Sequence, residues 1–135
     1  IQRFVRKMIR LRLSLDVFKE DRGLSLNQFL QTAQIDWHGI RLNQPDWSDH
    51  SHSLAFTVQR GELLFHIIFN AYREALDFEL PASTEDSPGS WRRIIDTYLE
   101  SPEDICSLAE APSVEHPTYL AQPPSVVLLA SILKQ

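Results

Sequence analysis

The sequence has few glycines and a single cysteine, and each shortage excludes a class of chemistry. Its 135 residues include four glycines and one cysteine. Loops that hold phosphate groups, and the G-x-S-x-G turn of serine hydrolases, need clustered glycines that this chain lacks. The lone Cys106 excludes an internal disulfide and is weak evidence for a reducing compartment. We interpret Cys106 as a small side chain on a partly buried segment.

The chain also lacks an apolar run long enough to span a membrane, and it shows no signal-peptide pattern. With 43% hydrophobic and 23% charged residues, its composition is that of an ordinary globular protein. Its length is that of one domain, which typically buries about two-thirds of the unfolded surface. The sequence does not begin with Met, and its first residues already lie within an amphipathic pattern. We therefore expect it to be a piece of a longer protein.

The first residues of the chain are strongly basic, whereas the rest carries a net negative charge. Residues 1–15 carry five basic residues and no acid, whereas the remaining residues hold all 18 acidic side chains. A protein that binds nucleic acid presents a positive surface to the phosphates. The acidic body therefore argues against a nucleic-acid partner.

Residues 1–15 have the apolar spacing of a helix. Ile1, Phe4, Val5, Met8 and Ile9 recur at intervals of three and four, which gives one apolar stripe. One interpretation is a basic amphipathic helix for a membrane surface or a partner protein. The other is a helix docked on its own protein with its arginines in solvent. We favour the second because interfacial helices are the rarer use of this pattern.

From residue 32 the hydrophobic period changes to two, which is typical of strands. After a connector at residues 16–31, we predict strands at 32–37, 53–59, 63–70, 75–80, 91–97, 118–122 and 125–129. The run at 126–130 is continuously apolar, so we expect the last strand to be central and covered on both faces. This pattern predicts a mainly β fold: an antiparallel β-sandwich of Greek-key type with seven or eight strands, preceded by one N-terminal α-helix. We place the domain boundary between residues 31 and 32, so that 1–31 and 32–135 are separate units.

The segment at residues 35–53 holds two of the three tryptophans and three of the five histidines, which suggests a catalytic or metal-binding site. His50 and His52 share one face of an extended chain, and His38, Asp46 or Asp49 can complete a metal site. The neighbouring serines and aspartates are typical of turns, however, and no second His/Cys cluster exists. We therefore favour a solvated loop, and predict neither a metal site nor a cofactor.

Asp36 and Asp46 are the best candidates for the paired carboxylates of glycoside hydrolysis. Catalytic acids need a buried pocket that shifts their pKa, and these two lie in polar surroundings. We interpret both as structural, with Asp46 forming an Asx-type turn after Pro45 that orients Trp47. We therefore predict no catalytic residue in this chain.

The tryptophans can stack on sugar rings or pack in a core. Trp37 and Trp91 lie in predicted strands, so we expect both in the core. Trp47 lies in a loop and is the one candidate carbohydrate contact. Burial between domains is the alternative role for Trp47, because tryptophan is also favoured at interfaces.

Several short motifs follow one another along the chain in a specific order. They are Ile35-Asp36-Trp37-His38-Gly39, Gln44-Pro45-Asp46-Trp47-Ser48, Ser53-Leu54-Ala55-Phe56, Asn70-Ala71-Tyr72, Phe78-Glu79-Leu80-Pro81, Trp91-Arg92-Arg93 and Ser125-Val126-Val127-Leu128-Leu129. In this order they resemble the C-terminal β-sandwich of bacterial glycogen debranching enzymes, the isoamylase-type members of the α-amylase superfamily. Residues 4–12 resemble the last helix of that family's catalytic barrel. One departure is Arg73, where family members often have tryptophan.

The resemblance implies a parent enzyme that hydrolyses α-1,6 branch linkages in glycogen or limit dextrin. The family's catalytic carboxylates lie on barrel strands, upstream of everything in this sequence. The implied role of this chain is a non-catalytic domain that stabilises the catalytic barrel of the same parent chain. The alternative is an accessory α-glucan-binding module that uses Trp47. The resemblance also implies a bacterial, cytoplasmic protein with no membrane partner.

Overall fold

The structure is a computed structural model that describes residues 2–15, 34–60, 63–81 and 91–132. It contains one helix and eight strands: α1 (Gln2–Leu15), β1 (Gln34–His38), β2 (Ser53–Arg60), β3 (Leu63–Asn70), β4 (Leu76–Glu79), β5 (Trp91–Asp96), β6 (Ser113–Val114), β7 (Thr118–Ala121) and β8 (Ser125–Ile132). The predicted helix and all seven predicted strands are confirmed, with ends shifted by a few residues at most. Sequence alternation missed β6 because two residues show no period. The predicted connector and domain boundary lie outside the described residues.

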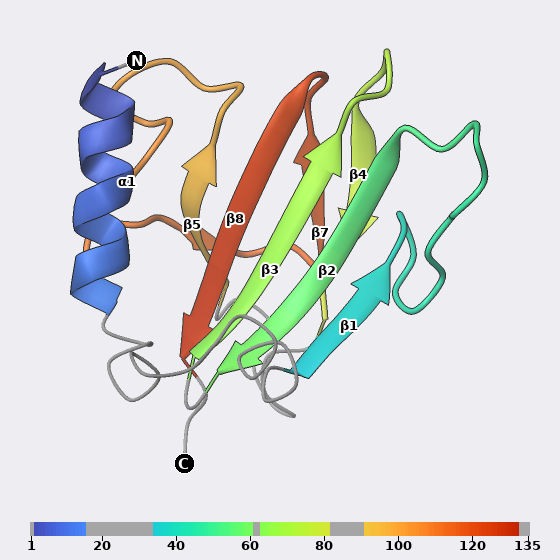
Figure 1. The fold of residues 1–135 in the computed structure, drawn as a ribbon, viewed down its shortest axis with the longest axis horizontal. Coiled ribbons are helices and arrows are strands. Elements are labelled where there is room, and N and C mark those ends of the chain that lie inside the picture. The colour runs from blue at the N-terminus through green and yellow to red at the C-terminus, as the bar shows by residue number, and fades with distance from the viewer. Residues whose placement is uncertain (1, 16–33, 61–62, 82–90, 133–135) are drawn as a thin grey trace.

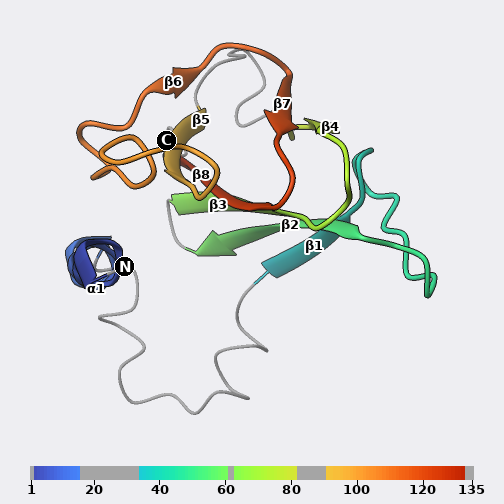
Figure 2. The same ribbon diagram turned by 90° about the horizontal axis from the view of Figure 1, so that it is seen from above.

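The strands form two antiparallel sheets, which confirms a mainly β fold consistent with the predicted sandwich. The larger sheet has the order β1-β2-β3-β8-β5-β6, and the smaller one pairs β4 with β7. Figure 2 shows α1 on one side of the larger sheet and the β4–β7 pair on the other. β8 lies between β3 and β5, so the prediction of a central last strand is confirmed (Figure 1). The prediction that it is covered on both faces is wrong at Val126, which is 38% exposed.

The face of the larger sheet that points to the β4–β7 pair forms the main core. Its centre is a cluster of buried apolar side chains: Ala55, Leu64, Ile68, Phe78, Leu80, Trp91, Ala121, Val127 and Leu129. Trp91 is buried as predicted, and its indole N–H donates to the Pro81 carbonyl at 2.8 Å. Phe78 faces this core, whereas Asp77 on the same strand is exposed, so the predicted alternation of β4 is confirmed.

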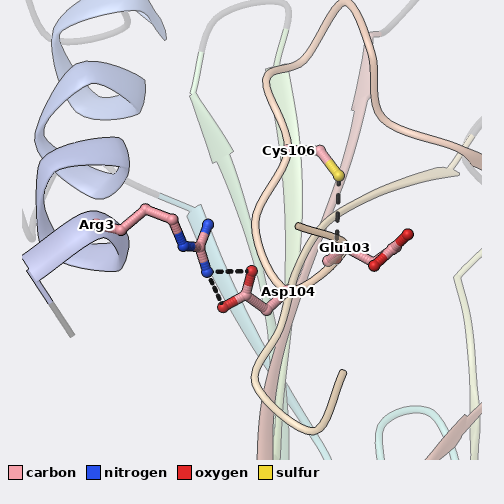
Figure 3. Close-up of polar contacts among 4 residues, drawn as sticks. All are labelled: Arg3, Glu103, Asp104 and Cys106. Atoms are coloured by element: carbon pink, nitrogen blue, oxygen red, sulfur yellow. Dashed lines mark hydrogen bonds and ion pairs between the residues drawn. The ribbon is translucent and has the colours of Figure 1, made fainter. Parts of the chain in front are cut away.

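The opposite, outer face of the larger sheet is covered in part by α1. Phe4 and the buried Leu11 pack against a second cluster that includes Phe65, Ile95 and Ile105. At the helix start, the Arg3 guanidinium donates to both carboxylate oxygens of Asp104, at 2.6 and 2.7 Å (Figure 3). The prediction that the helix docks on its own protein is therefore confirmed.

The helix docks through only part of the apolar stripe that its sequence suggested. Phe4 packs on the domain, whereas Val5, Met8 and Ile9 are 48%, 45% and 56% exposed. The ion pair of Arg3 and the apolar contacts of Phe4 and Leu11 hold the helix so that the rest of the stripe stays exposed. The expectation that the arginines are solvated is wrong for Arg3, which is only partly exposed.

Candidate functional site

The tryptophan- and histidine-rich segment forms the end of β1 and the loop that leads to β2. The loop folds back at its start, where the amides of Gly39 and Gln44 both donate to the Arg41 carbonyl, at 3.2 and 3.3 Å. Asn43 has a φ of 60°, a left-handed conformation that asparagine tolerates better than most residues. A Cβ on Gly39 would lie 2.4 Å from the Gln44 carbonyl oxygen, so only glycine fits there.

We expect Gly39→Ala to destabilise the chain by roughly 2 kcal/mol, because the new methyl group must push the Gln44 carbonyl away. The matched control is Asn43→Gly in the same loop. Its expected effect is only a few tenths of a kcal/mol, since glycine adopts a positive φ without strain. Urea unfolding followed by circular dichroism measures both changes. Equal stability of the two variants would contradict the close approach at Gly39.

The side chain of His38 takes part in a buried hydrogen-bond network and is not exposed as the histidines of the loop are. Its Nδ1 accepts the Asn43 amide N–H at 2.8 Å, and its Nε2 lies 2.8 Å from Thr57 Oγ1. Thr57 Oγ1 in turn lies 3.0 Å from His66 Nδ1. Since Nδ1 of His38 is an acceptor, we assign its proton to Nε2, and the Thr57 hydroxyl then donates to His66. His38 therefore donates to Thr57, and Thr57 donates to His66.

Burial keeps both histidines of this network neutral. It lowers the pKa of His38, against an opposing effect of the Asp36 carboxylate. Burial, reinforced by repulsion from His38, lowers the pKa of His66 to about 3. His66 Nε2 is buried and has no hydrogen-bond partner among the described residues, so a charge there would lack compensation.

The side chains considered for a metal site do not come together. His38 is buried, whereas His50 and His52 are exposed, and the ring of His52 stacks on Tyr72 with centroids 6.2 Å apart. In the ranges that the structure describes, no three His, Cys, Asp or Glu side chains are placed to hold a metal ion. Asp36 and Asp46 are both exposed and share no buried pocket.

Asp46 forms the predicted Asx-type turn, which contains Trp47. The Ser48 amide donates to Asp46 Oδ1 at 3.0 Å, and this hydrogen bond lowers the pKa of the Asp46 carboxyl group. The carboxylate is thus held ionised beside an indole that is 64% exposed. Both predictions for this loop, the Asx-type turn and the exposure of Trp47, are confirmed.

Four aromatic rings, here called the aromatic row, extend from Trp47 across the outer face of the sheet. Trp47 meets Trp37 edge to face with centroids 5.4 Å apart. Trp37 lies 5.2 Å from Phe56, and Phe56 stacks on Phe69 at 6.0 Å. Trp37 is 42% exposed, so the prediction that it lies in the core is wrong. The reason is that Trp37 lies on the outer face of the edge strand β1.

A hollow of about 410 Å³ lies beside the aromatic row, and its lining includes Asp46, Trp47, Ser48, His52, Leu54 and Phe69. A second hollow of about 290 Å³ shares Phe69 with the first and continues to Val126. The loop position of Trp47 identified it as a candidate from the sequence, whereas no sequence signal identified Phe56 and Phe69 as part of the site. Their alternation was visible, but only the strand pairing Trp37–Phe56 and Leu54–Phe69 places them together.

The family of the chain follows from a sequence match that covers this site. Residues 36–131 match the family described as isoamylase 1-3, C-terminal. The chain belongs to this isoamylase C-terminal family. The resemblance to the C-terminal part of an isoamylase-type enzyme is therefore confirmed, and the matched range includes most of β1, all of β2 to β7 and nearly all of β8.

Individual relatives agree with this family. The isoamylase domain described here is 33% identical over 108 residues to the chloroplastic isoamylase SU1 of Zea mays, with 78% of this chain and 12% of the relative covered. It is 32% identical over 132 residues to the chloroplastic isoamylase 3 of Oryza sativa subsp. japonica, with 94% and 15% covered. The chain thus spans only 12% to 15% of the length of these relatives. Since both are chloroplastic plant proteins, the bacterial and cytoplasmic origin stays a prediction. Among the described helical residues, no helix is long and apolar enough to cross a membrane.

Proposed function

We propose that this isoamylase C-terminal domain is a non-catalytic cap that stabilises the catalytic barrel of its parent chain. We further propose that the parent hydrolyses α-1,6 linkages in a branched α-glucan such as glycogen or limit dextrin. The observation that carries the cap function is the exposed apolar strip on α1, formed by Val5, Met8 and Ile9. These residues follow the i, i+3, i+4 spacing that places side chains next to one another on a helix.

The other face of α1 already packs on the sandwich. The helix can therefore contact the sandwich with one face and the proposed barrel with its exposed strip. Arg3 binds Asp104 and Leu11 is buried against the sandwich, so the exposed strip cannot turn inward without breaking these contacts. Contiguous exposed apolar side chains mark interaction sites more often than free surface. A covering partner within the same chain is consistent with the relatives, of which this domain corresponds to only 12% to 15%.

The cap function predicts that Met8→Gln lowers the melting temperature of the full-length parent by several degrees. Glutamine has nearly the helix propensity of methionine, but burying it in place of Met8 would lose about 1.5–3 kcal/mol of apolar transfer free energy. We expect turnover per folded molecule to stay near normal. Thermal unfolding and initial rates on branched glucan, measured on the same preparations, separate the two effects.

The matched control is Arg6→Gln, which changes an exposed polar position of the same helix. Its melting temperature should equal that of the unmodified parent. In the 135-residue domain alone, Met8→Gln should have little effect, because the strip is exposed there. An unchanged melting temperature of the full-length Met8→Gln variant would contradict the cap. Release of reducing ends from branched glucan by the domain alone would contradict its non-catalytic role.

The alternative function, an accessory α-glucan-binding module, is favoured by the exposed indole of Trp47 beside a hollow that contains polar groups. The surface proposed to contact the barrel and the surface around Trp47 lie on different parts of the domain. Figure 1 shows α1 next to β5, while β1 and the loop at residues 39–52 lie at the far edge of the same sheet. A barrel docked on the α1 strip can therefore leave the aromatic row open.

A further inference from the structure

We propose that the two hollows that meet at Phe69, here called the aromatic groove, bind a linear stretch of an α-1,4-linked glucan. The site would hold the polysaccharide on the domain and would take no part in bond cleavage. The choice of α-glucan as ligand rests on the activity proposed for the parent. The location of the site rests on the geometry of the aromatic row, the polar lining and the shape of the groove.

The aromatic row provides a rigid apolar surface of the kind that pyranose rings contact through their C–H faces. Trp47 alone would be a mobile loop side chain, but its ring edge contacts Trp37, which is supported by Phe56 and Phe69. The Asx turn at Asp46 also fixes the backbone on either side of Trp47. A ring that is already held in place loses little conformational entropy when a ligand binds.

The polar lining matches a ligand that has hydroxyl groups and no charge. Around the first hollow, Asp46, Ser48 and His52 offer hydrogen-bond acceptors and donors between the apolar rings. None of the described residues that line either hollow is lysine or arginine, so these residues offer an anionic ligand no countercharge. A flat protein surface docked here would remove these polar groups from water without partners, at a cost in free energy. Sugar hydroxyls would provide the partners.

The shape of the groove favours a chain of sugars over a single one. Trp47 lines the first hollow, and the second, which shares Phe69 and Ala71 with it, is also lined by Val126 and Thr97. The two hollows, of about 410 and 290 Å³, are therefore neighbours, and a chain of sugars is long enough to contact both whereas a single sugar is not. Phe69, exposed between them, provides a second apolar contact for a neighbouring sugar ring.

The test is a titration of the 135-residue domain with maltoheptaose, followed by amide NMR shifts and tryptophan fluorescence. We expect saturable binding in the millimolar range, with shifts confined to residues 46–54, 69–71 and 124–126. Trp47→Ala should weaken binding by about tenfold or more, as is usual when a central tryptophan contact is truncated. Trp47→Phe, which keeps a smaller ring, should weaken it less. The matched control is Tyr98→Ala, another exposed aromatic residue that lies outside the groove, and it should bind as the unmodified domain does.

Three results with the isolated domain, and one with the parent, would overturn the proposal. One is the absence of shifts at tens of millimolar maltoheptaose, and another is equal affinity of the Trp47→Ala and unmodified domains. The third is an equal response to cellohexaose, whose β-linked chain has a different curvature. In the parent, a lower melting temperature of Trp47→Ala with unchanged glucan affinity would show that the groove is a contact between domains, which also overturns the proposal. The cap function depends on Met8 and is tested separately, so either proposal can fail alone.

Discussion

Acidification from pH 7 to pH 4 is expected to lower the free energy of unfolding of this domain by about 3 kcal/mol through His66 alone. The reason is the position of this imidazole inside the sandwich, where burial lowers its pKa from 6.5 to about 3. Between these two pH values the unfolded chain binds a proton that the folded chain does not bind. The stabilising contribution is therefore complete above about pH 6.5 and is lost as the pH falls toward 3. His38 acts in the same direction.

The matched pair of variants for this prediction is His66→Asn and His116→Asn. Asparagine keeps an acceptor near the position of Nδ1 for the Thr57 hydroxyl, but it cannot be protonated in this range. His66→Asn should lower stability at pH 7 because of its smaller volume, and it should flatten the plot of stability against pH by up to one proton, about 1.4 kcal/mol per pH unit. His116 is exposed, so its variant should keep the slope of the unmodified domain. Urea unfolding at pH 4, 5, 6 and 7 measures these slopes, and identical slopes for all three proteins would refute the role of His66.

Phe78→Ala is expected to destabilise the domain by about 3–5 kcal/mol, and thus to lower the melting temperature by about 10 °C or more. The Phe78 side chain is fully buried and extends from the two-stranded sheet into the core of the larger one. The smaller sheet has further attachments. Among them are the hydrogen bonds from Tyr119 Oη to the Asp96 carboxylate and from Asn70 Nδ2 to the Ala121 carbonyl. Loss of the Phe78 ring therefore weakens the contact between the sheets at its centre.

The control for Phe78→Ala is Leu120→Ala, which removes an apolar side chain of similar size from β7 in the same small sheet. Leu120 is 54% exposed, so its truncation should cost less than about 1 kcal/mol. Thermal and denaturant unfolding of the two variants under the same conditions measure the difference. A similar loss of stability in both would show that the side chain of Phe78 does not connect the sheets as described.

The local features of the aromatic groove were largely predictable from the sequence. Pro45-Asp46-Trp47-Ser48 predicts an Asx-type turn with an exposed tryptophan, because the hydrogen bond that forms this turn lies within three residues. The hairpin of β2 and β3 was predictable for the same reason, since alternation and a short turn are local signals. The groove itself was not predictable. It depends on β1, β2, β3 and β8 lying side by side, and no local pattern shows which strands become neighbours.

By itself, the sequence determined the elements of this domain except β6, their order and its family, because periodicity, turn chemistry and motif order are properties of the chain. Only the tertiary structure decided which surface of each element is covered. On β3, one alternating set is entirely apolar, yet the other set, which contains His66 and Asn70, faces the sandwich interior. There, His66 Nδ1 finds a partner in Thr57, and the Asn70 amide finds one in the Ala121 carbonyl. On α1, the distant Asp104 sets the rotation that leaves Met8 exposed. These outcomes depend on contacts between residues far apart in the chain, and such contacts exist only after the strands have paired.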